Sequence, residues 1–151
     1  MRGGLLDAER FAAAQAVDAL EFAHAWYWER DANAGPYSSE AICLGHARTS
    51  DGLILIIADE ITPITRKEYN AAKRACAPRY IFLKQGVTRS DAANRFIARE
   101  RHHAVTVNFQ NASELQSRIL DSVRAYAVWV GRREQIRRRL GTDPKRAKVR
   151  V

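Results

Sequence analysis

The sequence predicts an α/β protein with an open, doubly wound, mostly parallel sheet. Three observations lead to this fold class. Segments with helical spacing of apolar residues alternate with short apolar or aromatic runs along the chain. One run, residues 52–57 (GLILII), is apolar on both alternating faces, as in a central strand that helices cover on both sides. Turn residues such as Ser50, Asp51 and Pro78 separate the segments.

The first part of the chain predicts two helices and one strand. Residues 5–23 are rich in Ala and Leu, with polar residues near helical spacing, so this segment should be a helix with one apolar face. Residues 24–29 (HAWYWE) form a short aromatic run before a turn, which is typical of a strand. Ser38 or Ser39 can cap a second helix that runs through Ala47.

Beyond the GLILII run, helices and strands continue to alternate. Thr65 with Glu68, and Ser113 with Gln116, have the spacing of a capping box, in which hydroxyl and carboxyl or amide groups bond backbone N–H groups at the helix start. Residues 104–109 have one polar face, as an edge strand does. The expected elements are helix 65–76, strand 79–84, helix 90–102, strand 104–109 and a last helix from about Ser113 with the apolar stripe Leu115, Ile119, Val123, Tyr126 and Val130.

The positive charge of the chain is concentrated near its C-terminal end. Of 25 Lys and Arg and 17 Asp and Glu, residues 131–151 hold nine basic and two acidic ones. We therefore divide the chain into an α/β domain at 1–130 and a basic helical extension and tail at 131–151. The tail could bind nucleic acid or other phosphates, with acidic lipid, a partner domain or solubility as alternatives. Its candidate contacts are Arg132, Arg133, Arg137, Arg138, Arg139, Lys145, Arg146 and Lys148.

Composition and spacing exclude several classes of protein. No apolar run approaches the roughly 20 residues of a membrane span, and acids within the first ten residues are unlike a secretory signal. Cys43 and Cys76 are expected as small core residues of a reduced, cytoplasmic protein. We predict no metal site, because His102 and His103 are adjacent and point apart, and should instead close the preceding helix.

Four segments of the chain, taken in order, resemble a family of bacterial TIR-like domains. That family, of unassigned function, often lies at the N-terminus of STAND-type signalling ATPases and is more distantly similar to TIR domains and nucleoside 2-deoxyribosyltransferases. The resemblance covers about residues 5–130 and implies a flavodoxin-like or TIR-like sandwich. The four segments are LLDAERFAAAQAVDAL, SSEAICLGHARTSDGLILIIADEIT, TRKEYNAAKRACAPRYIFLK and NRFIARE.

The same resemblance implies a buried first strand before the first helix. Only MRGG precedes residue 5, and four residues with two glycines are too few for that strand. Either the chain is truncated or mis-started, or the sheet is rearranged around a missing central strand, and we expect four recognisable strands in place of five. The vacancy would leave apolar neighbours and backbone groups of the sheet without partners.

The resemblance also implies a role for Glu68. In TIR hydrolases and deoxyribosyltransferases, a glutamate early in the helix after the third strand acts at the anomeric carbon of a ribosyl group. Cleaving an N-glycosidic bond places positive charge on the sugar, which a carboxylate can stabilise or attack. The alternative is that Glu68 only caps its helix. Asp59, Glu60, Thr65 and Lys84 are the further ligand-binding candidates, with solvated side chains or, for Thr65, a cap as the alternative.

Three functions from different classes follow from these patterns. The first is a signalling or defence domain that binds a nucleotide or NAD-like ligand and hydrolyses its N-glycosidic bond, with no other cofactor required. The second is a non-catalytic module that self-associates or docks to a larger ATPase, which an exposed sheet edge favours. The third is nucleic-acid binding through the tail. Trp26 and Trp28 alternate with Tyr27, so we expect them in the core and not as a base-stacking platform.

Overall fold

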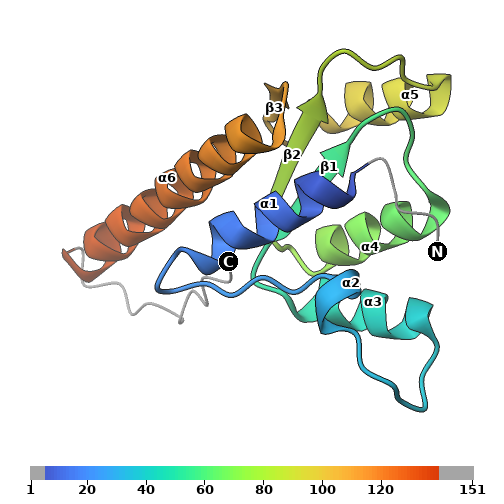
Figure 1. Ribbon diagram of the computed structural model, residues 1–151. Coiled ribbons are helices and arrows are strands. Elements are labelled where there is room, and N and C mark those ends of the chain that lie inside the picture. Colours follow the sequence, from blue (N-terminus) through green and yellow to red (C-terminus); the bar gives the residue numbers. More distant parts are fainter. Residues whose placement is uncertain (1–5, 140–151) are drawn as a thin grey trace.

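The computed structural model describes residues 6–139 (Figure 1). Helices and strands alternate from residue 39 onward, and two further helices come before that residue. In chain order the elements are α1 (Asp7–Asp18), α2 (Trp28–Asp31), α3 (Ser39–Thr49), β1 (Leu53–Ile57), α4 (Pro63–Arg74), β2 (Arg79–Lys84), α5 (Asp91–Glu100), β3 (Thr106–Phe109) and α6 (Ala112–Arg139).

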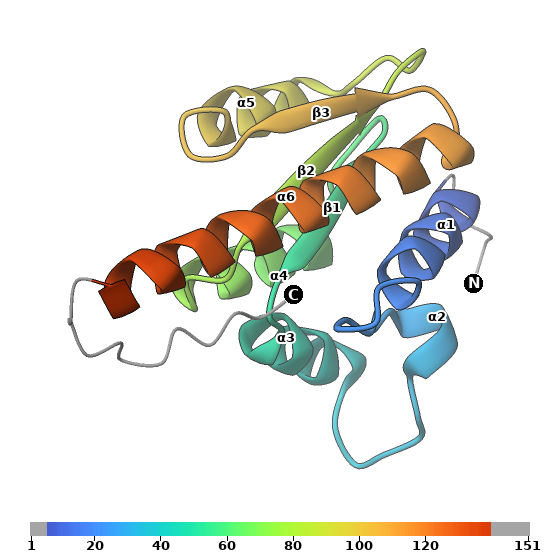
Figure 2. The same ribbon diagram turned by 90° about the vertical axis from the view of Figure 1, so that its left-hand side faces the viewer.

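The three strands form one parallel sheet in the order β1-β2-β3. Leu55 lies opposite Ile81, and Phe82 lies opposite Val107. Figures 1 and 2 show α1 and α6 on one face of the sheet and α4 and α5 on the other. The doubly wound α/β class is confirmed, with the long C-terminal helix, and the arrangement is consistent with a flavodoxin-like fold.

Each face of the sheet has its own hydrophobic core, because alternate residues of a strand point to opposite sides. On the α1 and α6 side, Phe82 and Phe109 pack with Val17, Leu115 and Ile119. The other side is built from Leu55, Ile57, Ile81, Leu83, Tyr69, Phe96 and Ile97. The apolar stripe predicted for the last helix is thus confirmed at its first three positions, where Leu115, Ile119 and Val123 are buried.

Two strand predictions are wrong. Residues 24–29 are a loop that ends in α2, so the described sheet has three strands and not four. None of Trp26, Tyr27 and Trp28 is fully buried, and Trp26 stacks on His46 instead of entering a core. The GLILII run is a strand, but β1 lies at the edge of the sheet while β2 is central. Composition indicates strand-forming residues, but the partner strands that are present decide whether a segment forms a strand and whether that strand is central or at an edge.

Two helix starts also differ from the predicted capping boxes. Thr62 caps α4, and its side-chain oxygen accepts a hydrogen bond from Thr65 N at 3.3 Å. Pro63 follows at the first helical position, where its missing N–H costs no hydrogen bond. At α6, Asn111 Oδ1 accepts from Glu114 N at 2.9 Å, so the cap lies two residues before Ser113. The boxes failed because both helices begin earlier than predicted, so that the N–H groups of Glu68 and Gln116 lie inside the helix and not at its start.

The remaining structural predictions have mixed outcomes. Ser38 caps α3, as expected, and Ser90 caps α5 at the predicted start of that helix. Cys43 is buried, but Cys76 is exposed, with a positive φ of 57° just after α4, so its assignment to the core is wrong. α6 continues without a break through residue 131 to Arg139. No helix among residues 6–139 is both long enough and apolar enough to span a bilayer.

Candidate functional site

A groove of about 940 Å³ runs beside the outer edge of β1. β1 contributes Leu53 to Ile56 to its lining, and α1 contributes Ala13, Ala14 and Val17. α3 and the first half of α4 form the opposite side, and the loop at 24–28 adds a further wall. Residues before β1, such as Asp51, and after it, such as Asp59, also line the groove, so it follows the strand and reaches the carboxyl edge of the sheet. Ligands of open α/β sheets bind at that edge.

Glu68 projects into this groove from α4 and is half-buried. Burial raises the pKa of the Glu68 carboxyl above its ordinary value of 4.5, against the lowering effects of a hydrogen bond from the Cys43 thiol and the charge of Arg10. None of the ion pairs between described residues includes Glu68. The groove therefore holds a desolvated carboxyl group without a fixed counter-ion.

The start of α4 determines where Glu68 lies. Thr62 ends the turn after β1 and begins the helix, so Glu68 falls in its second turn, out of reach of the terminal N–H groups. The Thr65 backbone N–H donates a hydrogen bond to the Thr62 hydroxyl oxygen, and the two hydroxyl oxygens lie 2.9 Å apart. The capping interpretation of Glu68 is therefore wrong. The carboxyl group is left available to the groove.

The structure brings most of the predicted ligand-binding residues together. Asp59, Glu60 and Thr65 line the same groove as Glu68. Asp59 and Glu60 are exposed, and the Asp59 carboxylate accepts a hydrogen bond from Glu60 N at 3.0 Å. Lys84, by contrast, forms an ion pair with Glu9 of α1 and does not line the groove. The sequence places Lys84 at the correct edge of the sheet, but the partner comes from a helix 75 residues away.

Two contacts at the groove have no signal in the sequence. Cys43 of α3 lies against Glu68, and burial together with the Glu68 carboxylate raises the pKa of its thiol to about 11. Arg10 of α1 forms an ion pair of 2.7 Å with Glu29, so these charges meet at the groove wall. The contacts join segments far apart along the chain. Only the packing of α3 against α4 and of α2 beside α1 creates them.

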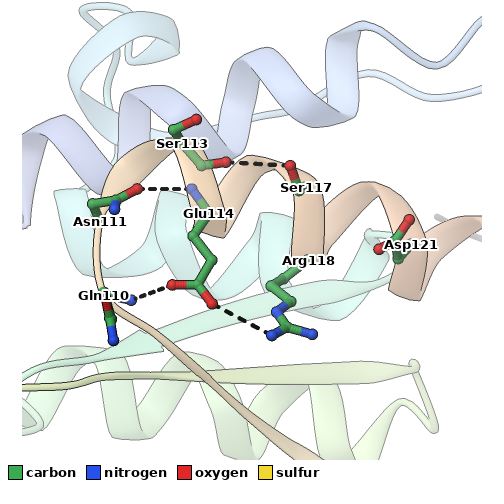
Figure 3. Close-up of a pocket in the computed structure, with 7 residues that line it drawn as sticks. All are labelled: Gln110, Asn111, Ser113, Glu114, Ser117, Arg118 and Asp121. Atoms are coloured by element: carbon green, nitrogen blue, oxygen red, sulfur yellow. Dashed lines mark hydrogen bonds and ion pairs between the residues drawn. The ribbon is translucent and has the colours of Figure 1, made fainter.

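A second hollow lies on the surface at the start of α6 (Figure 3). Its polar groups satisfy one another. The Glu114 carboxylate accepts from Gln110 N at 2.8 Å and from Arg118 at 3.4 Å, while Asn111 accepts from Glu114 N. These bonds are the capping interactions of the helix, so we assign this hollow a structural role.

Two carboxylates are buried among residues 6–139: Glu9, which forms the ion pair with Lys84, and Glu100, which is fully occupied by partners. Its side chain is 1 % exposed and accepts hydrogen bonds from Tyr69 Oη at 2.9 Å, Lys73 Nζ at 3.0 Å and Arg99 Nε at 3.0 Å. Burial opposes the charged form, but these donors outweigh it and lower the pKa of Glu100 to about 2. Glu100 joins α5 to α4 and does not line the groove.

The basic residues at the end of α6 show little organisation. Arg133 lies over the Trp129 ring, 4.6 Å from its centroid, and Arg138 forms a 3.4 Å ion pair with Glu134. Arg132, Arg137 and Arg139 belong to the same last turns, whereas the candidates Lys145, Arg146 and Lys148 lie outside the described residues. Nucleic-acid contact stays a prediction. Among residues 6–139, no group of His, Cys, Asp or Glu could hold a metal ion.

Comparison with known protein families gives one match. The family described as "Domain of unknown function (DUF4062)" matches residues 5–124. The chain belongs to this family. The match extends from the first helix into α6 and includes β1, Glu68 and the whole groove lining. Searches of the curated proteins and of the solved structures found no match.

Proposed function

We propose that this DUF4062 domain binds a nucleotide or NAD-like ligand in the groove and that Glu68 acts at its N-glycosidic bond. The observation that carries the proposal is the half-buried Glu68 carboxyl group, which forms no ion pair with any described residue and lies in a groove that reaches the carboxyl edge of a parallel sheet. A perturbed carboxyl group in a cleft is a typical feature of catalytic sites. The resemblance to TIR-like domains supports the same class of ligand.

The chemistry suits a carboxylate without a fixed counter-ion. As the bond between the sugar and the base breaks, its electron pair leaves with the base and the sugar ring becomes positively charged. An ionised Glu68 would stabilise that cation in a site with little water, where the attraction is stronger than in solution. Water then supplies the oxygen that bonds to the anomeric carbon, and its proton passes to the carboxylate or to solvent. Asp59, Glu60 and Thr65 would contact the polar ligand at the open end of the groove.

Incubation of the protein with NAD, NADP and a panel of nucleosides tests this proposal. We expect release of the free base, measured by liquid chromatography, and a loss of about a hundredfold or more in Glu68→Gln. Glu40→Gln is the matched control, because it removes an exposed carboxylate from the wall of the same groove that is not among the proposed ligand contacts, and it should keep most of the activity. The proposal fails if no compound is consumed, or if the Glu68→Gln protein reacts at the rate of the wild type.

A non-catalytic interaction module is the second candidate function. The open edge of β1 favours it, because an apolar strand at a sheet edge presents backbone groups that another strand can pair with. Such a role is compatible with ligand binding, since signalling domains can couple the two.

A further inference from the structure

The charges of residues 1–130 nearly balance, but they are divided unevenly along the chain. Residues 6–60 hold three Lys and Arg against ten Asp and Glu, whereas residues 61–105 hold ten against three. This basic segment includes α4, β2 and α5. Figures 1 and 2 show its two helices on one face of the sheet, opposite α1 and α6. The segment that covers this face therefore carries an excess of positive charge.

Carboxylates neutralise the basic segment only in part. Lys67 pairs with Glu40 and Lys84 pairs with Glu9, so these two cations are bound by acids of the first segment. Three arginines of α4 and α5 belong to none of the ion pairs between described residues: Arg66, Arg74 and Arg95. Their charge is available to a partner molecule.

Cations from both helices meet where α4 lies beside α5. Arg66 of α4 reaches across to α5, where its guanidinium group lies 5.8 Å from the centroid of the Phe96 ring. Arg99 of α5 lies over the same ring, at 5.3 Å from its centroid. Lys73 and Arg99 also form ion pairs with the Glu100 carboxylate, each at 3.0 Å. The boundary between the two helices thus gathers three cations around one negative charge.

Two further arginines extend this positive surface along the helices. Arg74 lies in the last turn of α4 and Arg95 lies near the middle of α5, and both are exposed. Of the acids on the two helices, Glu100 is buried and Glu68 faces the groove, which leaves Asp91 at the start of α5. We use the name basic face for the surface formed by Arg66, Lys73, Arg74, Arg95 and Arg99.

The chemistry of the basic face favours one class of partner. None of the large apolar side chains that are exposed among the described residues lies on α4 or α5. The centre of a protein–protein interface is apolar, and helices that lie in a membrane surface insert apolar side chains, so neither partner matches this face. Phe96 and Tyr69 are buried, so these rings cannot stack on unpaired bases. Four of the five cations are arginines, whose planar guanidinium groups bind phosphate oxygens in pairs.

We propose that the basic face binds the phosphate backbone of a double-stranded nucleic acid. In a duplex the bases are stacked inside and the phosphates lie outside, so the arginines meet regularly spaced negative charges. The contacts are made to the backbone and not to base edges, so binding is independent of sequence and weakens steeply as salt is added. The contacts of Arg66 and Arg99 with the Phe96 ring hold both guanidinium groups in place before the partner binds.

This inference goes beyond the function proposed at Glu68 and does not depend on it. The basic face and the groove lie on different sides of α4, because Arg66 and Lys73 contact α5 whereas Glu68 faces the groove. The basic face also differs from the basic end of the chain, because α6 lies on the opposite face of the sheet (Figures 1 and 2). Duplex binding can therefore be measured without any reaction, and a failure of one proposal leaves the other standing.

Fluorescence anisotropy of the full chain with a labelled duplex of about 30 base pairs, at several salt concentrations, tests the inference. DNA and RNA duplexes of one sequence form the two arms, and the tighter complex identifies the nucleic acid. The double variant Arg74→Gln/Arg95→Gln removes two exposed cations from the basic face. We expect its affinity to fall by about tenfold and the slope of log K against log salt to become shallower by about two. Arg74→Lys/Arg95→Lys keeps the charges and should keep the slope.

Arg118→Gln/Arg124→Gln is the matched control, because it removes the same charge from exposed positions of α6 on the opposite face of the sheet. It should keep the affinity and the slope of the wild type. Equal losses in the two glutamine variants, or no loss in Arg74→Gln/Arg95→Gln, overturn the inference. Phosphatidylserine vesicles and poly-glutamate serve as competitors at the same concentration of charge. If either displaces the labelled duplex as well as unlabelled duplex does, the partner is an anionic lipid or an acidic protein, and the inference is overturned.

Discussion

The two sides of α4 lead to two carboxyl groups with opposite surroundings. On one side, Tyr69 and Lys73 donate hydrogen bonds to Glu100, which also binds Arg99. On the other side, Glu68 enters the groove, where the Cys43 thiol is its hydrogen-bond donor. The pKa of Glu100 is lowered and that of Glu68 is raised. Two adjacent residues of one helix, Glu68 and Tyr69, thus belong to different environments.

The difference teaches how to separate a structural acid from a candidate functional one. A buried carboxylate whose oxygens are filled by donors stabilises the fold and has nothing to offer a ligand. A desolvated carboxylate whose oxygens accept few hydrogen bonds carries its charge at a cost in free energy in the free protein. A cationic or donor-rich ligand lowers that cost. Burial alone does not distinguish the two cases. The number of hydrogen bonds that the carboxylate accepts distinguishes them.

The largest expected contrast is in the free energy of unfolding of two matched variants. Glu100→Gln should cost about 2 kcal/mol, because a neutral amide cannot replace the ion pairs and its N–H₂ group faces other donors. Glu68→Gln should change stability by less than about 1 kcal/mol, in the stabilising direction, because it removes a desolvated charge. Urea unfolding at neutral pH measures both. Similar losses in the two variants would show that Glu68 is also a structural group.

The pH dependence of stability should separate the same two groups. The pKa of Glu100 is about 2 in the folded state and near 4.5 when unfolded, so its stabilisation is complete above pH 4.5 and is lost as the pH falls toward 2. The pKa of Glu68 is raised on folding, so its ionisation destabilises the protein as the pH rises above 4.5. As the pH rises, the ionisation of Glu100 therefore stabilises the folded protein and the ionisation of Glu68 destabilises it.

Urea unfolding between pH 3 and pH 7 measures this dependence. The deficit of Glu100→Gln relative to the wild type should shrink as the pH falls. The advantage of Glu68→Gln should disappear at pH values below 4.5, where the wild-type carboxyl group is neutral in both states. A deficit of Glu100→Gln that is independent of pH would show that charge is not the basis of its contribution.

The smallest effect concerns the cap of α4 and tests whether Glu68 has a capping role. Thr62→Ala should cost about 1 kcal/mol, because Thr65 N loses its acceptor at the helix start. Thr65→Ala keeps that backbone N–H and the Thr62 oxygen, so it should cost less. Thermal or urea unfolding measures the difference. A larger loss in Thr65→Ala than in Thr62→Ala would restore the capping box of Thr65 with Glu68.

The three strands and every described helix except α2 could be predicted from the sequence because their signals are local. Ser38 was predicted as a cap and a helix was predicted from Ser90, and both side chains accept from N–H groups three residues later. The RYIFLK run became β2 because it is apolar and follows Pro78 directly. The convergence of Asp59, Glu60, Thr65 and Glu68 also followed from topology, because all lie just after β1 or early in the next helix.

The errors arose where a local signal competes with a distant partner. Residues 24–29 have strand composition, but no neighbouring strand lies beside them. Lys84 is at the predicted edge, but the Glu9 carboxylate reaches it from α1. Cys76 is small and follows an amphipathic helix, yet the chain reversal after α4 leaves it exposed. None of these contacts is encoded in residues close together along the chain.

The sequence by itself determined the α/β class, the order of helices from residue 39 onward and the segment that carries the candidate acid. Hydrophobic periodicity and short-range capping suffice for these, since they act over a few residues. Only the tertiary structure decided that β1 lies at an edge, that Glu68 faces a groove and that the charged Glu100 carboxylate is surrounded by hydrogen-bond donors. These properties depend on which distant groups share a volume, because burial and the supply of donors set the state of a carboxyl group.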